Sequence, residues 1–302
     1  MKIAENPASA GKNESLRRAI ERSLREGWTI KRVAGMTTEA IEAQLHAYGV
    51  SHSRERFLRL AEGRDSAWSI SEVWFETDPI TCRGQEEDFL GLAACELWKR
   101  LLPERPSVEM LDDWMQEGYT LLEQERGAAA CDLWWKVWST LRSRFDGTMT
   151  TLQSTYLVFN GLQSLFNWTQ DFELALEQVS SRDPRYAQLG QQYCSDWIAQ
   201  FRDEGGLEQV NIRRTLAFFR FRLGDAGGAA AALHETVERW PGNVWGYVAL
   251  ADAYSHADPG GNIFPLDPQK ARSYLERALA LPGLDEYERD AVHERLEELS
   301  RV

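Results

Sequence analysis

Apolar side chains recur every three or four positions along most of the chain, which is the period of an amphipathic α-helix. Leu16, Ile20 and Leu24 show this spacing, as do Val137 and Leu141 further on. No run alternates apolar and polar residues for long enough to indicate a β-strand. The pattern therefore predicts an all-α protein made of stacked antiparallel helix pairs. Before residue 205, helices are expected over about 13–26, 38–48, 53–61, 65–77, 86–101, 107–124, 128–144, 150–168 and 184–202.

Polar capping residues mark several of these helix starts. Thr38 lies four residues before a glutamate and resembles a capping box, while Ser53, Asp65 and Ser107 each precede an apolar periodic run. Asp183 precedes a proline, which is typical of an N-cap followed by the first helical position. We therefore expect these residues to satisfy the free N–H groups at the helix starts.

The most apolar of the predicted helices opens at Thr150 or Thr151. It contains many large side chains up to Trp168. The same pattern is compatible with a helix that continues to Val179 and with a break near Asn167, and both alternatives stay open.

Pro103 and Pro106 interrupt the chain and cannot both continue a helix. They mark the best internal boundary. The sequence thus predicts a disordered N-terminus over residues 1–12, an N-terminal helical region over 13–105 and a helical repeat domain over 107–302.

Two copies of a helix–turn–helix unit lie in the last third of the chain. In the first copy, the small residues Ala217 and Ala229 are 12 positions apart, as expected where two helices approach closely. In the second copy, the equivalent residues Ala251 and Ala271 are 20 positions apart. Eight residues are therefore inserted in the second turn, at 258–265.

From Val210 to Pro282, the spacing of large, small and aromatic residues resembles the tetratricopeptide repeat, a helix pair of 34 residues. Arg213 and Arg220 stand where that repeat has apolar residues. The resemblance implies a right-handed α-solenoid whose first helices line a peptide-binding groove, closed by a polar helix over 284–299. A weaker copy contains Trp114, Gly118, Ala130, Trp134 and Val137.

The middle of the chain, LAACELWKRLLPERPSVEMLDDWMQEGY, also resembles uncharacterised bacterial helical-repeat proteins, some of which end in a cysteine-rich zinc motif called SEC-C. That motif is absent from this sequence. The resemblance therefore implies no metal, and we expect no cofactor.

Charge argues against nucleic acid as the main partner, because the formal net charge is −13 and phosphate backbones require basic surfaces. The first 64 residues nevertheless carry twelve Lys and Arg against eight Glu. Nucleic-acid binding by this basic head is therefore an alternative, although a solvated helix face is the better explanation of these charges. Its basic residues are Arg17, Arg18, Arg22, Arg25, Lys31, Arg32, Arg54, Arg56 and Arg59.

A search for catalytic and targeting motifs finds none that is specific. The four cysteines have no C-x-x-C spacing, the five histidines have no metal-binding spacing and no G-x-S-x-G sequence occurs. The twelve tryptophans are expected to fill gaps between helices, with an aromatic cage or a hidden hydrolase site as alternatives. Neither a signal peptide nor an apolar run of membrane-spanning length is evident, so we expect a cytoplasmic protein.

The best candidate site is the groove implied by the repeats. Arg214 and Arg222 are eight positions apart on one predicted helix face and flank Phe218, which would suit a peptide carrying carboxylates. Alternatively, both arginines pair with neighbouring acids such as Asp252. The candidate groove residues are Asn211, Arg214, Phe218, Arg222, Trp245, Asp252 and His256.

These observations predict a non-enzymatic scaffold or adaptor that binds a peptide or a helical surface of a partner protein. Regulation of a partner enzyme in a bacterial setting is an extension of this hypothesis.

Overall fold

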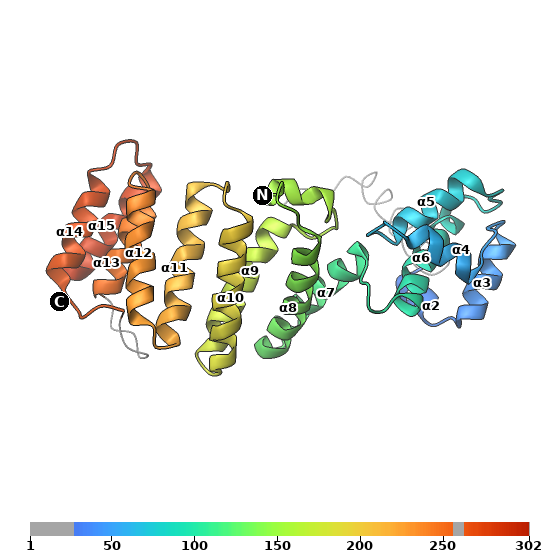
Figure 1. The fold of residues 1–302 in the computed structure, drawn as a ribbon, viewed down its shortest axis with the longest axis horizontal. Helices are drawn as coiled ribbons and strands as arrows, with labels where there is room; N and C mark the ends of the chain where they lie inside the picture. Colours follow the sequence, from blue (N-terminus) through green and yellow to red (C-terminus); the bar gives the residue numbers. More distant parts are fainter. Residues whose placement is uncertain (1–26, 256–262, 302) are drawn as a thin grey trace, which may run out of the picture. The chain divides into compact units, whose positions relative to one another are not determined.

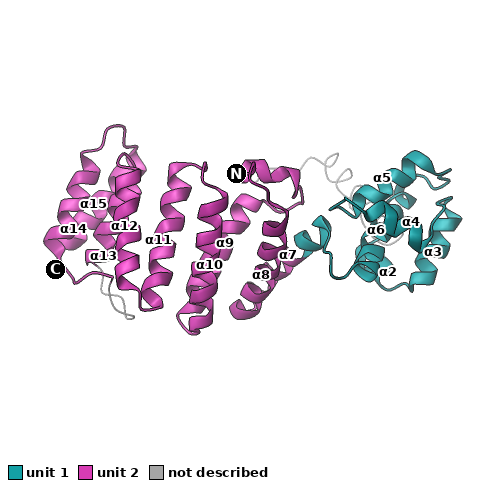
Figure 2. Cartoon of the chain, viewed as in Figure 1, with its two compact units in different colours: residues 1–113 teal, residues 114–302 magenta. Residues whose placement is uncertain are grey.

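The structure, a computed structural model, describes residues 27–255 and 263–301. The predicted disordered segment 1–12, the predicted helix 13–26, His256 and residues 258–262 lie outside this part. All regular elements in the described ranges are helical, so the all-α prediction is confirmed (Figure 1). The chain forms two compact units, residues 1–113 and 114–302 (Figure 2). The boundary that the two prolines predict lies slightly earlier, at 105–107.

Unit 1 is organised around large aromatic side chains. Phe57, Trp74 and Trp98 are fully buried, and the Phe57 ring lies 6.3 Å from Trp74 and 6.5 Å from Trp98 between ring centroids. The Trp98 indole N–H donates to the Arg105 carbonyl at 2.6 Å, which satisfies its one polar group. These tryptophans are core residues. The helices are α2 (Ile30–Ala34), α3 (Thr38–Ala47), α4 (Arg54–Ala61), α5 (Trp68–Thr77), η1 (Gly84–Glu86) and α6 (Asp88–Leu101).

The predicted caps are largely correct in position. Ser53 accepts a hydrogen bond at the start of α4, and Ser107 does so at the start of α7 (Val108–Glu123). The cap of α3 is Thr37, whose hydroxyl accepts from the Ala40 N–H at 3.2 Å. A cap at the Thr37–Thr38 pair is therefore confirmed at its first residue, whereas the capping box suggested from Thr38 to Glu42 is wrong because Thr38 is already helical.

The free backbone N–H groups at the start of α5 donate to a residue that is distant in the sequence. Asp65 was expected to cap this helix, but the carboxylate of Glu109 accepts hydrogen bonds from the N–H groups of Ala67 and Trp68 at 2.9 and 3.0 Å. It also accepts from the Ser66 hydroxyl at 2.5 Å. The Asp65 prediction is corrected accordingly, since a long-range acid performs the role of a local cap.

Unit 2 is a solenoid of consecutive helix pairs (Figure 1). The first helices of successive pairs, α9, α11 and α13, also contact one another and so form one layer of the array. The last helix, α15, buries only Val292 completely, which agrees with the expected polar cap. Beyond α7, the elements are α8 (Gly127–Arg144), η2 (Leu152–Leu157), α9 (Leu165–Ser180), α10 (Pro184–Gln200), α11 (Gly206–Arg222), α12 (Ala226–Arg239), α13 (Val244–Ser255), α14 (Pro268–Leu279) and α15 (Glu286–Ser300).

Glycines permit the closest helix approaches in this array. A Cβ at Gly118 would lie 2.6 Å from the Cδ1 atom of Trp134 and closer still to its indole nitrogen. The same indole N–H donates to the Met115 carbonyl at 3.0 Å, so the Trp134 side chain of α8 packs directly against the α7 backbone. A Cβ at Gly190 would lie 2.5 Å from the Cε1 atom of Phe219 and so separate α10 from α11.

The two arginines that replace apolar residues of the repeat are incorporated into the packing. Arg213 is 6% exposed, and its guanidinium lies 4.8 Å from the Trp240 ring centroid and donates to the Gln209 side chain. Arg220 donates to the Gly228 carbonyl at 3.1 Å across the turn. Both side chains therefore stabilise the repeat from positions where the pattern expected apolar groups.

The inserted turn of the second copy packs against its own repeat. Phe264 stacks on Tyr254 with ring centroids 4.2 Å apart and planes 8° apart. The Lys270 Nζ atom lies over the Tyr254 ring, 4.4 Å from its centroid. The end of the insertion is therefore anchored, and Asp267 then caps α14.

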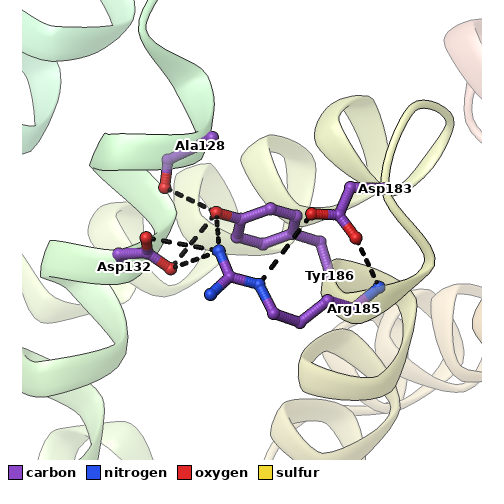
Figure 3. A network of polar contacts seen from close by, with 5 residues as sticks. All are labelled: Ala128, Asp132, Asp183, Arg185 and Tyr186. Carbon is purple, nitrogen blue, oxygen red and sulfur yellow. Dashed lines mark hydrogen bonds and ion pairs between the residues drawn. The ribbon is translucent and has the colours of Figure 1, made fainter.

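Second helices of adjacent pairs are tied together by a polar network (Figure 3). Arg185 of α10 contacts Asp132 of α8 at 3.1 Å and lies over the ring of Tyr186. The Tyr186 hydroxyl reaches the Ala128 carbonyl at 3.1 Å, and Asp183 caps α10 as predicted. This network fixes the register between α8 and α10.

The helix expected from residue 150 is wrong over 150–164, whereas the alternative that extended it toward Val179 agrees with α9, which runs from Leu165 to Ser180. A short 3₁₀ helix, η2, is followed by irregular chain over 158–164, and α9 begins only at Leu165. Thr151 and Ser154 form a capping box at the start of η2, and Ser164 caps the start of α9, so the local polar groups favour two separate elements. The break also lies upstream of Asn167. As a consequence Leu157 and Leu162 are 81% and 96% exposed.

Candidate binding surface on α9 and α11

One face of α9 and one face of α11 form a mixed apolar and charged surface within unit 2. Residues spaced three or four apart share a helix face, and α9 contacts α11 directly. We call this set of side chains the α9–α11 surface. Its members are Phe166, Gln170, Glu173 and Glu177 of α9, and Leu207, Asn211, Arg214, Phe218 and Arg222 of α11.

A cavity of about 100 Å³ opens at one end of this surface. Phe166 and Leu207 line it and are 42% and 44% exposed, so two large apolar side chains face solvent beside a recess. Two carboxylates, Glu173 and Glu208, line it as well. We call this recess the α9–α11 cavity. Its other lining residues are Leu152, Thr169, Gln170, Trp197, Asn211 and Ile212.

A second, larger cavity of about 220 Å³ adjoins the first. It lies over the 3₁₀ segment and the irregular chain before α9, and Leu152 and Phe166 line both cavities. Tyr156, which is 64% exposed, forms part of its wall. The apolar surface therefore continues from α11 across Phe166 to η2.

Glu173 has the most perturbed carboxyl group of the surface. Its pKa is raised to about 7, mainly by burial and to a smaller extent by the neighbouring Glu177 carboxylate, while the hydrogen bond from Thr215 and the charge of Arg214 oppose the rise. The Thr215 hydroxyl donates to Glu173 Oε1. Burial likewise raises the pKa of Glu177, and Arg214 is the main opposing charge. The site therefore holds a carboxyl group that changes charge near neutral pH.

The arginines of the predicted groove have different surroundings. Arg214 is exposed and lies close enough to Glu173 and Glu177 to stabilise their charged forms. Arg222 lies over the Phe218 ring at 5.2 Å, and its buried Nε donates no hydrogen bond. The acids near Arg214 are thus on α9, which the sequence analysis did not consider.

The predicted groove residues of α13 contact the last helix. The Trp245 ring lies 5.7 Å from that of Tyr287, and Asp252 accepts from Arg295 Nε at 2.9 Å. These two residues therefore lie on α13 next to α15, while Asn211, Arg214, Phe218 and Arg222 lie together on α11. His256 is outside the described residues.

The α9 half of the surface is absent from the groove that the sequence predicts. Its residues Phe166, Gln170, Glu173 and Glu177 do follow helical spacing. The signal was hidden because the predicted helix began near residue 150, which placed Phe166 near the end of an apolar helix. Recognising Ser164 as a cap would have given the correct start.

No group of three potential metal ligands occurs in the described ranges 27–255 and 263–301. In unit 1, His52 lies 3.3 Å from Glu42 and its ring centroid is 6.4 Å from that of His46. Burial lowers the pKa of His52, whose side chain lies in the core, whereas Glu42 is half-buried and His46 is exposed.

Over the same described residues, no helix combines the length and hydrophobicity that a bilayer crossing requires. Comparison with known proteins finds no family model that matches the chain and no significantly similar curated protein.

Proposed function

We propose that this chain is a non-enzymatic interaction scaffold of tetratricopeptide-like repeats that binds a segment of a partner protein on the α9–α11 surface. The observation that supports this most is the exposure of Phe166 and Leu207 beside a cavity on neighbouring helices. Regulation of a partner enzyme and a cytoplasmic location belong to the same proposal.

The physical basis is the apolar area available for burial. A large apolar side chain gains about 1.5 to 3 kcal/mol when it is fully buried, and aromatic residues beside recesses are frequent binding hot spots. About half of the surface of Phe166 and Leu207 is already buried in the free protein. The free energy gained when a partner buries the rest is therefore smaller than this range. Two such residues with a surrounding polar rim suffice for a specific but modest affinity.

Nucleic-acid binding by the basic head receives less support. Of its residues in the described ranges, Arg56 already forms an ion pair with Asp78 at 2.6 Å and donates to the Thr77 hydroxyl. A charge neutralised in this way contributes little to phosphate binding.

The experiment is a selection of binding peptides from a phage-displayed library of random short sequences. We expect wild-type protein to enrich a peptide family whose affinity falls at least tenfold in the double variant Phe166→Ser with Leu207→Ser, which corresponds to about 1.4 kcal/mol. Fluorescence polarisation with a synthetic selected peptide measures the affinity.

Leu174→Ser is the matched control for this variant. Leu174 is on α9 and is 52% exposed, but it lines neither of the two cavities. Its replacement should leave the affinity within about twofold, a surface change of a few tenths of a kcal/mol. Equal losses in the control and the double variant, or no enriched peptide at all, would refute the proposed function.

A further inference from the structure

We propose that the α9–α11 cavity receives a lysine or arginine side chain of the partner, whose cationic group binds Glu173 while an adjacent apolar side chain contacts Phe166 and Leu207. This inference rests on the proposed function and specifies the chemistry of its ligand. It differs from the carboxylate-bearing peptide that the arginines of α11 suggested from sequence.

Charge complementarity carries the inference. The cavity is lined by two carboxylate side chains, Glu173 and Glu208, and by no lysine or arginine. Arg214, whose charge acts on both Glu173 and Glu177, is not among the lining residues. Above about pH 7, where Glu173 is ionised, an anionic group entering the cavity would therefore meet two like charges, whereas a cation would meet two opposite charges.

Hydrogen bonding at Glu173 leaves one acceptor for a ligand. Its Oε1 atom accepts from the Thr215 hydroxyl, and Thr215 is itself buried. No described N–H or O–H group donates to Oε2, although the carboxylate lines the cavity. A cationic donor from a partner would complete the coordination of this oxygen and form a charge-assisted hydrogen bond.

The apolar walls suit the methylene stem of such a side chain. Phe166, Leu207 and Trp197 line the same cavity, and lysine and arginine bury their stems along apolar surface while the charged head reaches a polar group. Aromatic rings also attract cations through their faces.

The size of the recess favours a single side chain. Its volume is about 100 Å³, whereas sites for small-molecule ligands and cofactors usually measure about 300 to 1,000 Å³. One long side chain of a peptide fits this space, and the exposed apolar residues around it extend the contact to the neighbouring residues of the peptide.

The peptide selection also tests this inference. The readouts are the sequences of the selected peptides and their affinities for two protein variants, Glu173→Gln and Glu238→Gln. We expect selected peptides to contain Lys or Arg next to an apolar residue, and replacement of that cation by norleucine or citrulline to lower the affinity at least tenfold. Glu173→Gln keeps an acceptor for Thr215 but removes the charge, so it should lower the affinity by a similar factor. Glu238→Gln on the exposed face of α12 is the charge-matched control and should have no effect.

The pH dependence gives a second readout. Because the pKa of Glu173 is about 7, binding of the cationic peptide should strengthen from about pH 6 to about pH 8, and Glu173→Gln should abolish this rise. The other titratable or charged groups that face Glu173 or share its cavity are Glu177, Tyr193, Cys194, Glu208 and Arg214.

The outcomes separate this inference from the proposed function. Selected peptides that depend on Phe166 and Leu207 but contain no cation, or whose affinity is unchanged by Glu173→Gln, would overturn the inference and leave the proposed function intact. Failure to select any peptide that depends on these two apolar residues would overturn both.

Discussion

Replacing Gly118 by alanine is expected to lower the free energy of unfolding of unit 2 by about 2 to 3 kcal/mol. Overpacking a filled core costs about 1 to 3 kcal/mol, and the added methyl group would collide with the fully buried Trp134 indole. Displacing that indole would also break its hydrogen bond to Met115, which leaves a buried donor unpaired at about 1 to 3 kcal/mol. The better helix propensity of alanine raises the free energy of unfolding by only about 1 kcal/mol.

Urea denaturation followed by circular dichroism and tryptophan fluorescence measures this effect. Gly147→Ala is the control, because no atom lies within 4 Å of its added Cβ and the expected change is within about 0.5 kcal/mol. A Gly118→Ala protein as stable as wild type would show that α8 does not rest on α7 through Trp134.

Replacing Glu173 by glutamine is expected to stabilise the protein by about 2 kcal/mol near pH 8 and to change little near pH 4.5. Burial raises the pKa of this carboxyl group from 4.5 to about 7. A raised folded-state pKa means that the folded protein retains a proton that the unfolded chain loses, so stability falls as pH rises from about 4.5 through 7. Each pKa unit corresponds to about 1.4 kcal/mol. The expected stabilisation is smaller than the full shift because the group is only partly buried and reaches solvent through the cavity.

The measurement is the difference in unfolding free energy between Glu173→Gln and wild type at both pH values. Groups that titrate identically in the two proteins cancel in this difference, and Glu238→Gln controls for loss of net charge. A difference that is the same at both pH values would contradict a raised pKa at Glu173. A stabilising variant that binds peptide less well would identify Glu173 as a residue retained for binding at the expense of stability.

Helical periodicity allowed much of the fold to be predicted. A period of 3.6 residues specifies which side chains share a face, and Ala217, Ala229, Ala251 and Ala271 are accordingly buried where the helix pairs approach. The fold class and most helix positions follow from this local information.

The remaining features depend on contacts between distant residues. Glu109 caps α5 and Trp240 covers Arg213, and no spacing in the sequence reports these partners. For the same reason, the sequence predicts only the α11 half of the candidate surface. The residues on α11 were placed on one helix by periodicity, whereas their neighbours on α9 required the correct helix start and the packing of α9 on α11.

Hydrogen–deuterium exchange of the full chain with a selected peptide tests the proposed binding surface most directly. We expect peptide binding to slow exchange in residues 165–180 and 206–222, which form α9 and α11, and this protection should be absent from Phe166→Ser with Leu207→Ser. Protection confined to α13 and α15, or to unit 1, would contradict the assignment of the binding surface to α9 and α11.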